Sequence, residues 1–205
     1  EQFFSRTVDA VEDLREHIYK AAARLLLSVN WLPDEIGDSE KIGASRKYDR
    51  KEVGMQHNPW VDRLLAEFKQ FGAKVACADV PPQTAAILWE YAAETTAESM
   101  VEGFSRVRKC TELGRACMSL DLQVMLQWVK KQMNSQGREP NMRIVDNYIK
   151  AFYVPESELL HWAMTHPEYT RPQIIALINQ IATAYNWPRK QRAVLLAQIE
   201  ESLMC

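Results

Sequence analysis

Apolar residues recur every three or four positions over most of the chain, the spacing of one face of an α-helix. Alternation of apolar and polar residues, which would indicate a half-buried β-strand, is only faintly visible over residues 74–80. The pattern therefore predicts an all-α fold. In the first segment the repeating positions predict one long helix with a single apolar stripe, formed by Phe4, Val8, Val11, Leu14, Ile18, Ala22, Leu25 and Val29.

Prolines and glycines separate the periodic segments and predict where the next helices begin. Asn58 followed by Pro59 is typical of an N-cap and a first helical residue, so a second helix is expected over residues 59–75. A third helix is expected from Pro82 to about Arg108. Residues 30–46 are predicted to form a loop; its acidic residues lack the alternating spacing of a calcium-binding loop.

The segment "MVEGFSRVRKCTELGRACMSLDLQ", residues 100–123, combines basic side chains, cysteines and glycines. Its apolar positions keep a helical step on both sides of the basic residues, and Thr111 is a suitable cap for a new helix. We therefore expect a helix, a bend near Lys109 and a second helix. The apolar positions on either side of the bend include Val101, Phe104, Val107, Cys110, Cys117, Leu120, Val124 and Trp128.

The remaining residues form shorter periodic units that follow a polar linker, "NSQGREPN". Three of these units open with a capping residue and a proline, near Pro155, Pro172 and Pro188. Short helices with brief connections must fold back on one another. We therefore predict an elongated rod of two successive antiparallel bundles, residues 1–133 and residues 138–205, that share a packed junction.

Composition and charge remove several classes of function. The net charge of −2 argues against a dedicated nucleic-acid-binding protein, which usually carries a strong basic excess. No apolar run has the ~18 residues that a membrane-spanning helix needs, and Arg24 interrupts the best candidate. The four cysteines are far apart, as expected for reduced thiols in the cytosol. The first residue is Glu1, so we expect the chain to be a fragment of a longer protein.

The sequence gives no candidate metal, cofactor or catalytic residues. Cys110 and Cys117 lie two turns apart on a continuous helix, about 10 Å along its axis, which is too far for one zinc ion. The four histidines are scattered. Nucleophile elbows, phosphate-binding loops and dinucleotide fingerprints are absent from the sequence. We therefore expect a protein that is not an enzyme.

Basic residues form two clusters that are candidates for a partner surface. Charged clusters are often simply solvated, but these also suit an acidic partner helix or the head groups of anionic lipids. In the second cluster the cations stand at a helix start, where the helix dipole disfavours them. The candidate residues are Arg106, Arg108, Lys109 and Arg115 in the first cluster, and Arg189, Lys190 and Arg192 in the second.

Four long stretches carry a resemblance to a known family. Residues 52–71, 87–104, 101–123 and 147–179 resemble the C-terminal region of the syndetin family, the coiled-coil-containing subunits of the endosome-associated recycling protein (EARP) complex. Residues 7–26 show a weaker resemblance, so nearly the whole chain is covered. The loop at residues 30–46 and the linker before Pro140 depart from the family pattern.

The resemblance implies the C-terminal helical domain of a vesicle-tethering subunit of the helical-rod (CATCHR-like) type. Such a subunit acts in endosomal recycling and retrograde traffic, in the cytoplasm, peripherally on recycling endosomes and trans-Golgi network membranes. The resemblance also implies assembly with other tethering-complex subunits through N-terminal regions, and contacts with SNARE proteins, small GTPases or vesicle membrane. No cofactor and no nucleic-acid partner is implied. A module that binds anionic lipid directly is the alternative.

Overall fold

The computed structural model describes residues 2–37, 47–52, 56–133 and 140–202, with side chains from residue 14 onward. All regular secondary structure in these residues is helical, so the predicted all-α fold is confirmed. The elements are α1 (Gln2–Leu26), α2 (Leu32–Ile36), α3 (Pro59–Cys77), α4 (Pro82–Ser105), α5 (Glu112–Met133), α6 (Arg143–Lys150), η2 (Ala151–Tyr153), α7 (Glu156–Thr165), α8 (Arg171–Ala184) and α9 (Arg189–Ser202).

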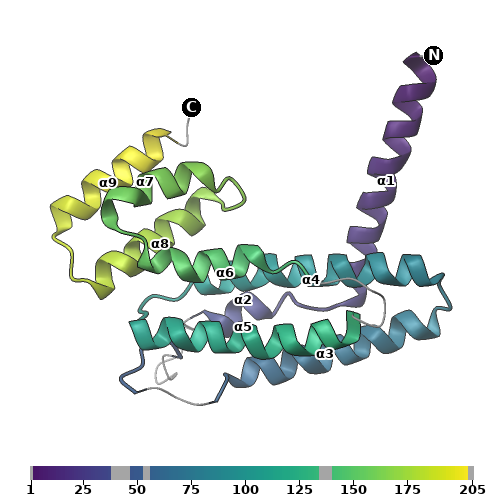
Figure 1. Cartoon of the computed structure of the whole chain (residues 1–205), viewed down its shortest axis with the longest axis horizontal. Coiled ribbons are helices and arrows are strands. Elements are labelled where there is room, and N and C mark those ends of the chain that lie inside the picture. Colours follow the sequence, from purple (N-terminus) through teal and green to yellow (C-terminus); the bar gives the residue numbers. More distant parts are fainter. Residues whose placement is uncertain (1, 38–46, 53–55, 134–139, 203–205) are drawn as a thin grey trace.

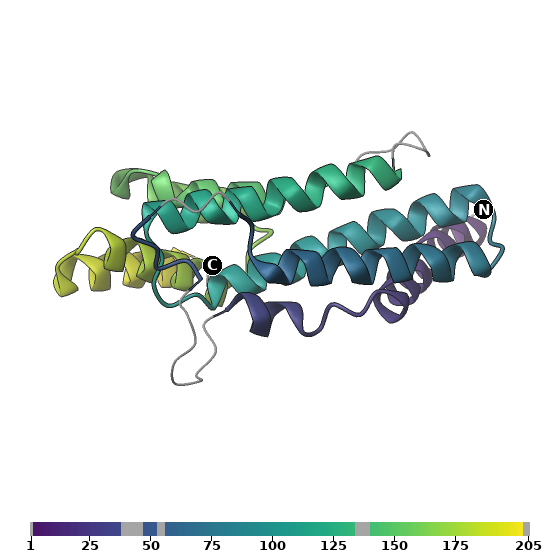
Figure 2. The same ribbon diagram turned by 90° about the horizontal axis from the view of Figure 1, so that it is seen from below.

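The body of the molecule is a layer of long helices with smaller helices at its sides. Helices α3, α4 and α5 run along the long axis, α2 packs on α4, and α6 lies along α4 and α5 (Figure 1). Helix α9 packs on α7 and α8, and α8 packs on α4. In both views α7–α9 lie at one end of the long axis and α1 lies at the other (Figure 2).

Local capping residues determine where several helices begin. Helix α3 starts with Pro59 at its first position and buries Trp60, Leu64 and Phe68 on one face. Helix α8 begins with a capping box in which Thr170 and Gln173 satisfy each other's backbone donors. These starts agree with the predicted ones. Asn58 is the N-cap residue of α3, as predicted, but its side chain makes no capping hydrogen bond.

The bend predicted near Lys109 is confirmed. Helix α4 ends at Ser105, three residues earlier than expected, and α5 begins at Glu112. The Gly114 N–H donates to Thr111 Oγ1 over 3.0 Å, so Thr111 caps α5. On α5 the buried face lies one residue further along the sequence than the expected stripe: Met118, Met125 and Val129 are buried. Leu120, Val124 and Trp128 are only partly buried.

Two features of the N-terminal segment differ from the prediction. The expected loop at residues 30–46 contains the helix α2, whose Leu32 and Ile36 are buried against α4; residues 38–46 lie outside the described part. Helix α1 uses another face than the predicted one, because Ala23 and Leu27 are buried whereas Leu14 and Leu25 are exposed. The side chains of Phe4, Val8 and Val11 lie outside the described residues.

The buried apolar side chains form one cluster that extends from Ala23 in α1 to Ile199 in α9. It contains residues of both predicted bundles, and Val145 and Ile149 of α6 belong to it together with the N-cap residue Met142. The division at residues 134–137 stays a prediction, since residues 134–139 lie outside the described part. Of the helices described, none is both long enough and apolar enough to cross a bilayer.

Candidate partner-binding surface

The connection between α4 and α5 presents the first group of predicted site residues. Val107 and Cys110 are buried and anchor this connection, whereas Arg106, Arg108 and Lys109 are exposed. We call these three exposed residues the α4–α5 basic turn. Because the ends of two long helices hold it on either side, the turn presents its cations at a fixed position at the surface.

Arg106 is already engaged in two ion pairs. Its Nε lies 3.0 Å from Glu102 Oε1, one helical turn earlier in α4, and its Nη1 contacts Asp34 Oδ1 of α2. All three side chains are well exposed, so each pair contributes little to stability. The pairs reduce the positive charge that Arg106 offers, and Lys109 is the better candidate for contact with an acidic partner.

Arg115 does not belong to this surface, which corrects the prediction. Its side chain is 0% exposed and its guanidinium lies 4.7 Å from the centroid of the Phe152 ring. Its Nη2 donates to Gln180 Oε1, while its Nε and Nη1 have no hydrogen-bond partner. A sequence signal was present: Arg115 shares the three–four spacing of the buried residues Met118, Leu122, Met125 and Val129.

Gln180 of α8 was missed by the sequence analysis and joins α8 to the end of α4. Its Nε2 donates to the carbonyl oxygens of Phe104 over 2.8 Å and Val107 over 2.7 Å. Carbonyl groups at a helix C-terminus lack partners within the helix, and Gln180 supplies one for them. Its Oε1 accepts from Arg115 at the same time, so one buried amide holds three segments together.

The second predicted cluster lies at the start of α9. Arg189 and Lys190 are exposed and Arg192 is half-buried. Lys190 also lines a groove of about 730 Å³ between α7 and α9, whose apolar side chains are Leu160, Val194 and Leu195. The structure therefore places Lys190 beside an apolar groove, an arrangement that the sequence alone did not show.

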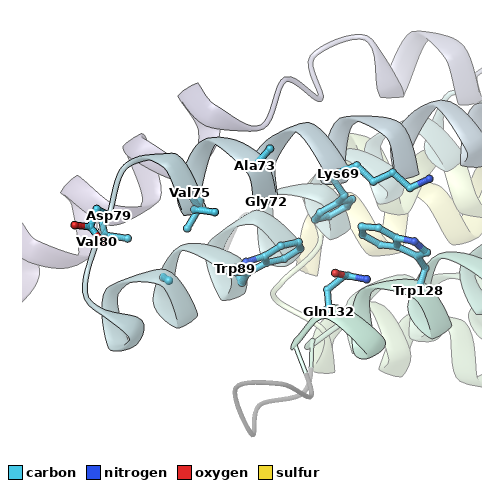
Figure 3. A pocket seen from close by; sticks show the side chains of 12 residues that line it. Lys69, Gly72, Ala73, Val75, Asp79, Val80, Trp89, Trp128 and Gln132 are labelled. Atoms are coloured by element: carbon cyan, nitrogen blue, oxygen red, sulfur yellow. The ribbon is translucent and has the colours of Figure 1, made fainter.

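A second concave surface lies between α3, α4 and α5 and is lined by aromatic side chains (Figure 3). Its volume is about 480 Å³. Phe68 and Trp89 stack with their ring planes 7° apart and their centroids 5.9 Å apart, and the Trp128 ring lies 6.2 Å from that of Phe68. Lys69 and Gln132 provide polar groups at this groove (Figure 3).

A buried polar group fixes Tyr48 and Asn58 against α5. Asp121 is 0% exposed and accepts hydrogen bonds from the Asn58 N–H and the Asn58 Nδ2, each over 2.7 Å, and from the Tyr48 hydroxyl over 2.8 Å. Burial raises the pKa of the Asp121 carboxyl, and these hydrogen bonds from Asn58 and Tyr48 oppose the rise. Asp121 therefore has a structural role: its hydrogen bonds join Tyr48 and Asn58 to α5, and its raised pKa follows from its burial there.

In the part of the chain that the structure describes, no group of three or more histidine, cysteine, aspartate or glutamate side chains is arranged to hold a metal ion. Cys110 and Cys117 are buried thiols outside any disulfide and belong to the apolar core. Burial raises the pKa of the Cys117 thiol, which keeps the sulfur protonated and unreactive at neutral pH.

Comparisons with known proteins agree with the resemblance. Residues 1–200 match the family model described as "Syndetin, C-terminal". The chain is 33% identical to syndetin of Mus musculus, 32% to that of Rattus norvegicus and 31% to that of Gallus gallus, each over 205 residues and 98% of this chain. It spans about a fifth of the length of these curated relatives, 20% of the mouse and rat proteins and 21% of the chicken protein. No solved structure matches it significantly. The chain belongs to the syndetin C-terminal family.

Proposed function

We propose that this chain is the C-terminal helical domain of a subunit of a multisubunit vesicle-tethering complex. The observation that carries the proposal is the family match over residues 1–200, together with a helical body that presents exposed cations. In this role the complex acts in endosomal recycling and retrograde traffic. The domain works by presenting surfaces and performs no chemical reaction.

The proposed subunit is peripheral on recycling endosomes and trans-Golgi network membranes, on their cytoplasmic side. It assembles with the other tethering subunits through regions outside this chain. The domain itself meets SNARE proteins, small GTPases or the vesicle membrane. Long helices braced along their length suit this task, because a tether must hold a binding surface at a fixed distance from its anchor.

Within the domain we assign partner contact to the α4–α5 basic turn and to the exposed cations at the start of α9. Lys109 and Arg108 extend from a connection whose neighbours Val107 and Cys110 are buried. Partner binding there loses little conformational entropy, since the backbone is already ordered. An acidic partner surface would gain electrostatic complementarity.

The test is a charge reversal in the full-length protein. Lys109→Glu and the double substitution Arg108→Glu/Lys109→Glu should reduce recruitment to endosomal membranes in cells, with the larger loss in the double variant. Lys131→Glu is the matched control, because Lys131 is exposed at the opposite end of α5. Unchanged recruitment in the double variant would contradict the assignment, and a lower melting temperature would show that these residues are structural.

Liposome flotation separates the protein partner from the lipid alternative. With a protein partner, the purified chain should not float with vesicles that contain phosphatidylserine or phosphoinositides any more than with neutral vesicles. Flotation that depends on acidic lipid and is lost in Arg189→Glu/Lys190→Glu would support direct lipid binding instead, through the exposed cations of α9.

A further inference from the structure

Helix α1 carries an apolar stripe that the body of the protein does not cover. Leu14, Ile18 and Leu25 are 59%, 56% and 85% exposed. Their spacing of four and seven residues places them on one face of the helix, and the exposed Ala21 lies between them. We call Leu14, Ile18, Ala21 and Leu25 the α1 seam. Exposed apolar side chains in a continuous row mark an interaction site more often than isolated ones do.

Another face of α1 attaches the helix to the body. Ala23 and Leu27 are buried, and Lys20 Nζ lies 2.7 Å from Glu94 Oε1 and 3.2 Å from Glu98 Oε1 of α4. At the C-terminal end of α1, Lys74 Nζ donates to the Leu26 carbonyl oxygen over 2.9 Å. These contacts fix the rotation of α1 and leave its seam exposed on the face that points away from them. Helix α1 itself projects from the body (Figure 1).

The seam has the three–four spacing of a coiled coil. With Ile18 and Leu25 at a positions, Leu14 and Ala21 are the d positions. The flanking e and g positions are then occupied by Arg15, His17, Ala22 and Arg24. No acidic residue is among these four. Arg24 Nη2 lies 2.8 Å from Glu98 Oε2, yet its side chain remains 51% exposed.

These flanking residues indicate the charge of the helix that fits. An antiparallel second copy would bring the Arg24 of one chain near the His17 of the other, without any attraction of opposite charges. A partner with Asp or Glu at its own e and g positions would meet Arg15 and Arg24 with opposite charge, which favours it over a second copy.

We propose that the α1 seam docks an amphipathic helix of a partner protein, with apolar residues at three–four spacing and acidic residues beside them. The partner helix extends the body of the protein at the end opposite α7–α9. This surface is distinct from the α4–α5 basic turn and from the start of α9. A negative result at either of those surfaces therefore does not contradict this proposal. Likewise, a negative result at the α1 seam does not contradict the roles proposed for the α4–α5 basic turn and the start of α9.

The test uses a synthetic four-heptad peptide with Leu at a and d and Glu at e and g, labelled for fluorescence anisotropy. The 205-residue chain should bind it, and Ile18→Glu/Leu25→Glu should weaken binding at least ~10-fold by placing charges in the seam. The same peptide with Lys at e and g should bind at least ~10-fold more weakly than the Glu peptide at low salt. Added salt should narrow this difference.

Val194→Glu is the matched control, since Val194 is an apolar residue of α9 that is 51% exposed, and it should leave peptide binding unchanged. The urea midpoint of the seam variant should equal that of the parent chain, because both substituted residues are exposed. Absence of binding, equal binding of the Glu and Lys peptides, or binding insensitive to the seam substitutions would overturn the proposal. A dimer in sedimentation that Ile18→Glu/Leu25→Glu converts to a monomer would also overturn it, because the occupant would then be a second copy.

Discussion

At the scale of single residues, Asp121 shows how a buried carboxylate joins distant parts of the chain. Both of its oxygens accept hydrogen bonds, Oδ1 from the Asn58 N–H and Oδ2 from the Tyr48 hydroxyl and Asn58 Nδ2. Tyr48 in turn accepts a hydrogen bond from Trp60 Nε1 over 3.0 Å. A network that is satisfied in this way specifies one arrangement of the start of α3 against α5.

Asp121→Asn should destabilise the protein by about 1–3 kcal/mol in urea unfolding at neutral pH, because an amide offers only one acceptor oxygen to these donors. The pH dependence is a second signature. The folded-state pKa of Asp121 is raised above 3.8, so the folded protein binds a proton more readily than the unfolded chain. The parent chain should therefore gain stability relative to the variant as the pH falls from the raised pKa towards 3.8.

Asp146→Asn provides the control for this experiment. Asp146 forms an exposed ion pair with Lys150 one turn later, with 2.6 Å between Oδ2 and Nζ, and its loss should cost under ~0.5 kcal/mol. If the stability difference between the parent chain and Asp121→Asn grew as the pH rose, the assigned direction of the pKa would be wrong.

Single residues also show what the sequence could not reveal. Arg115 has the spacing of the core, but its charge made a surface position the simpler prediction. Its burial depends on Phe152 and Gln180, which reach it only after the chain has folded back. Nothing within a few residues of Arg115 in the sequence predicts those contacts. Partners supplied by distant segments are what an analysis of local pattern misses.

At the scale of whole helices, prediction succeeded where local chemistry decides the outcome. The start of α3 follows from Pro59 and the start of α8 from the Thr170 capping box, both of which act within one helical turn. The bend before α5 follows from Thr111 in the same way. The apolar stripe of α1 did not indicate which face packs on the body. Tyr19, Ala23 and Leu27 form a second apolar face, and this second face is the one that contacts α4.

Gly114 in the first turn of α5 tests how closely the segment at residues 47–52 approaches that helix. A Cβ atom at Gly114 would lie 1.9 Å from the Tyr48 carbonyl oxygen, which itself accepts from the Thr111 N–H over 3.1 Å. Gly114→Ala should therefore destabilise the protein by at least ~2 kcal/mol in urea unfolding, despite the better helix propensity of alanine.

Gly72 of α3 supplies the comparison for this substitution. A Cβ atom there would lie 3.1 Å from the edge of the Trp89 ring, which a small movement of a side chain can relieve. Gly72→Ala should change stability by less than ~1 kcal/mol, because the gain in helix propensity offsets the tight contact. Equal effects of the two substitutions would mean that residues 47–52 do not pack on α5 as described.

At the scale of the whole molecule, Gln180, Arg115 and the end of α4 form a junction between α8 and the long helices α4 and α5. Three buried hydrogen bonds of Gln180 join α8 to this junction, and the apolar cluster continues through it. A contact of this kind couples the stability of the parts that it joins. We therefore expect α8 and α5 to unfold together.

Gln180→Leu preserves the approximate volume of the side chain and removes the amide. It leaves the Phe104 and Val107 carbonyl oxygens and the Arg115 guanidinium without this partner, so it should cost about 2–4 kcal/mol. Amide hydrogen exchange should show protection falling by the same amount in α5 and in α8. Gln127→Leu, at an exposed position of α5, should leave protection unchanged. Loss of protection in α8 alone would show that the C-terminal helices open as a separate unit, and the junction would then be a hinge between two bundles.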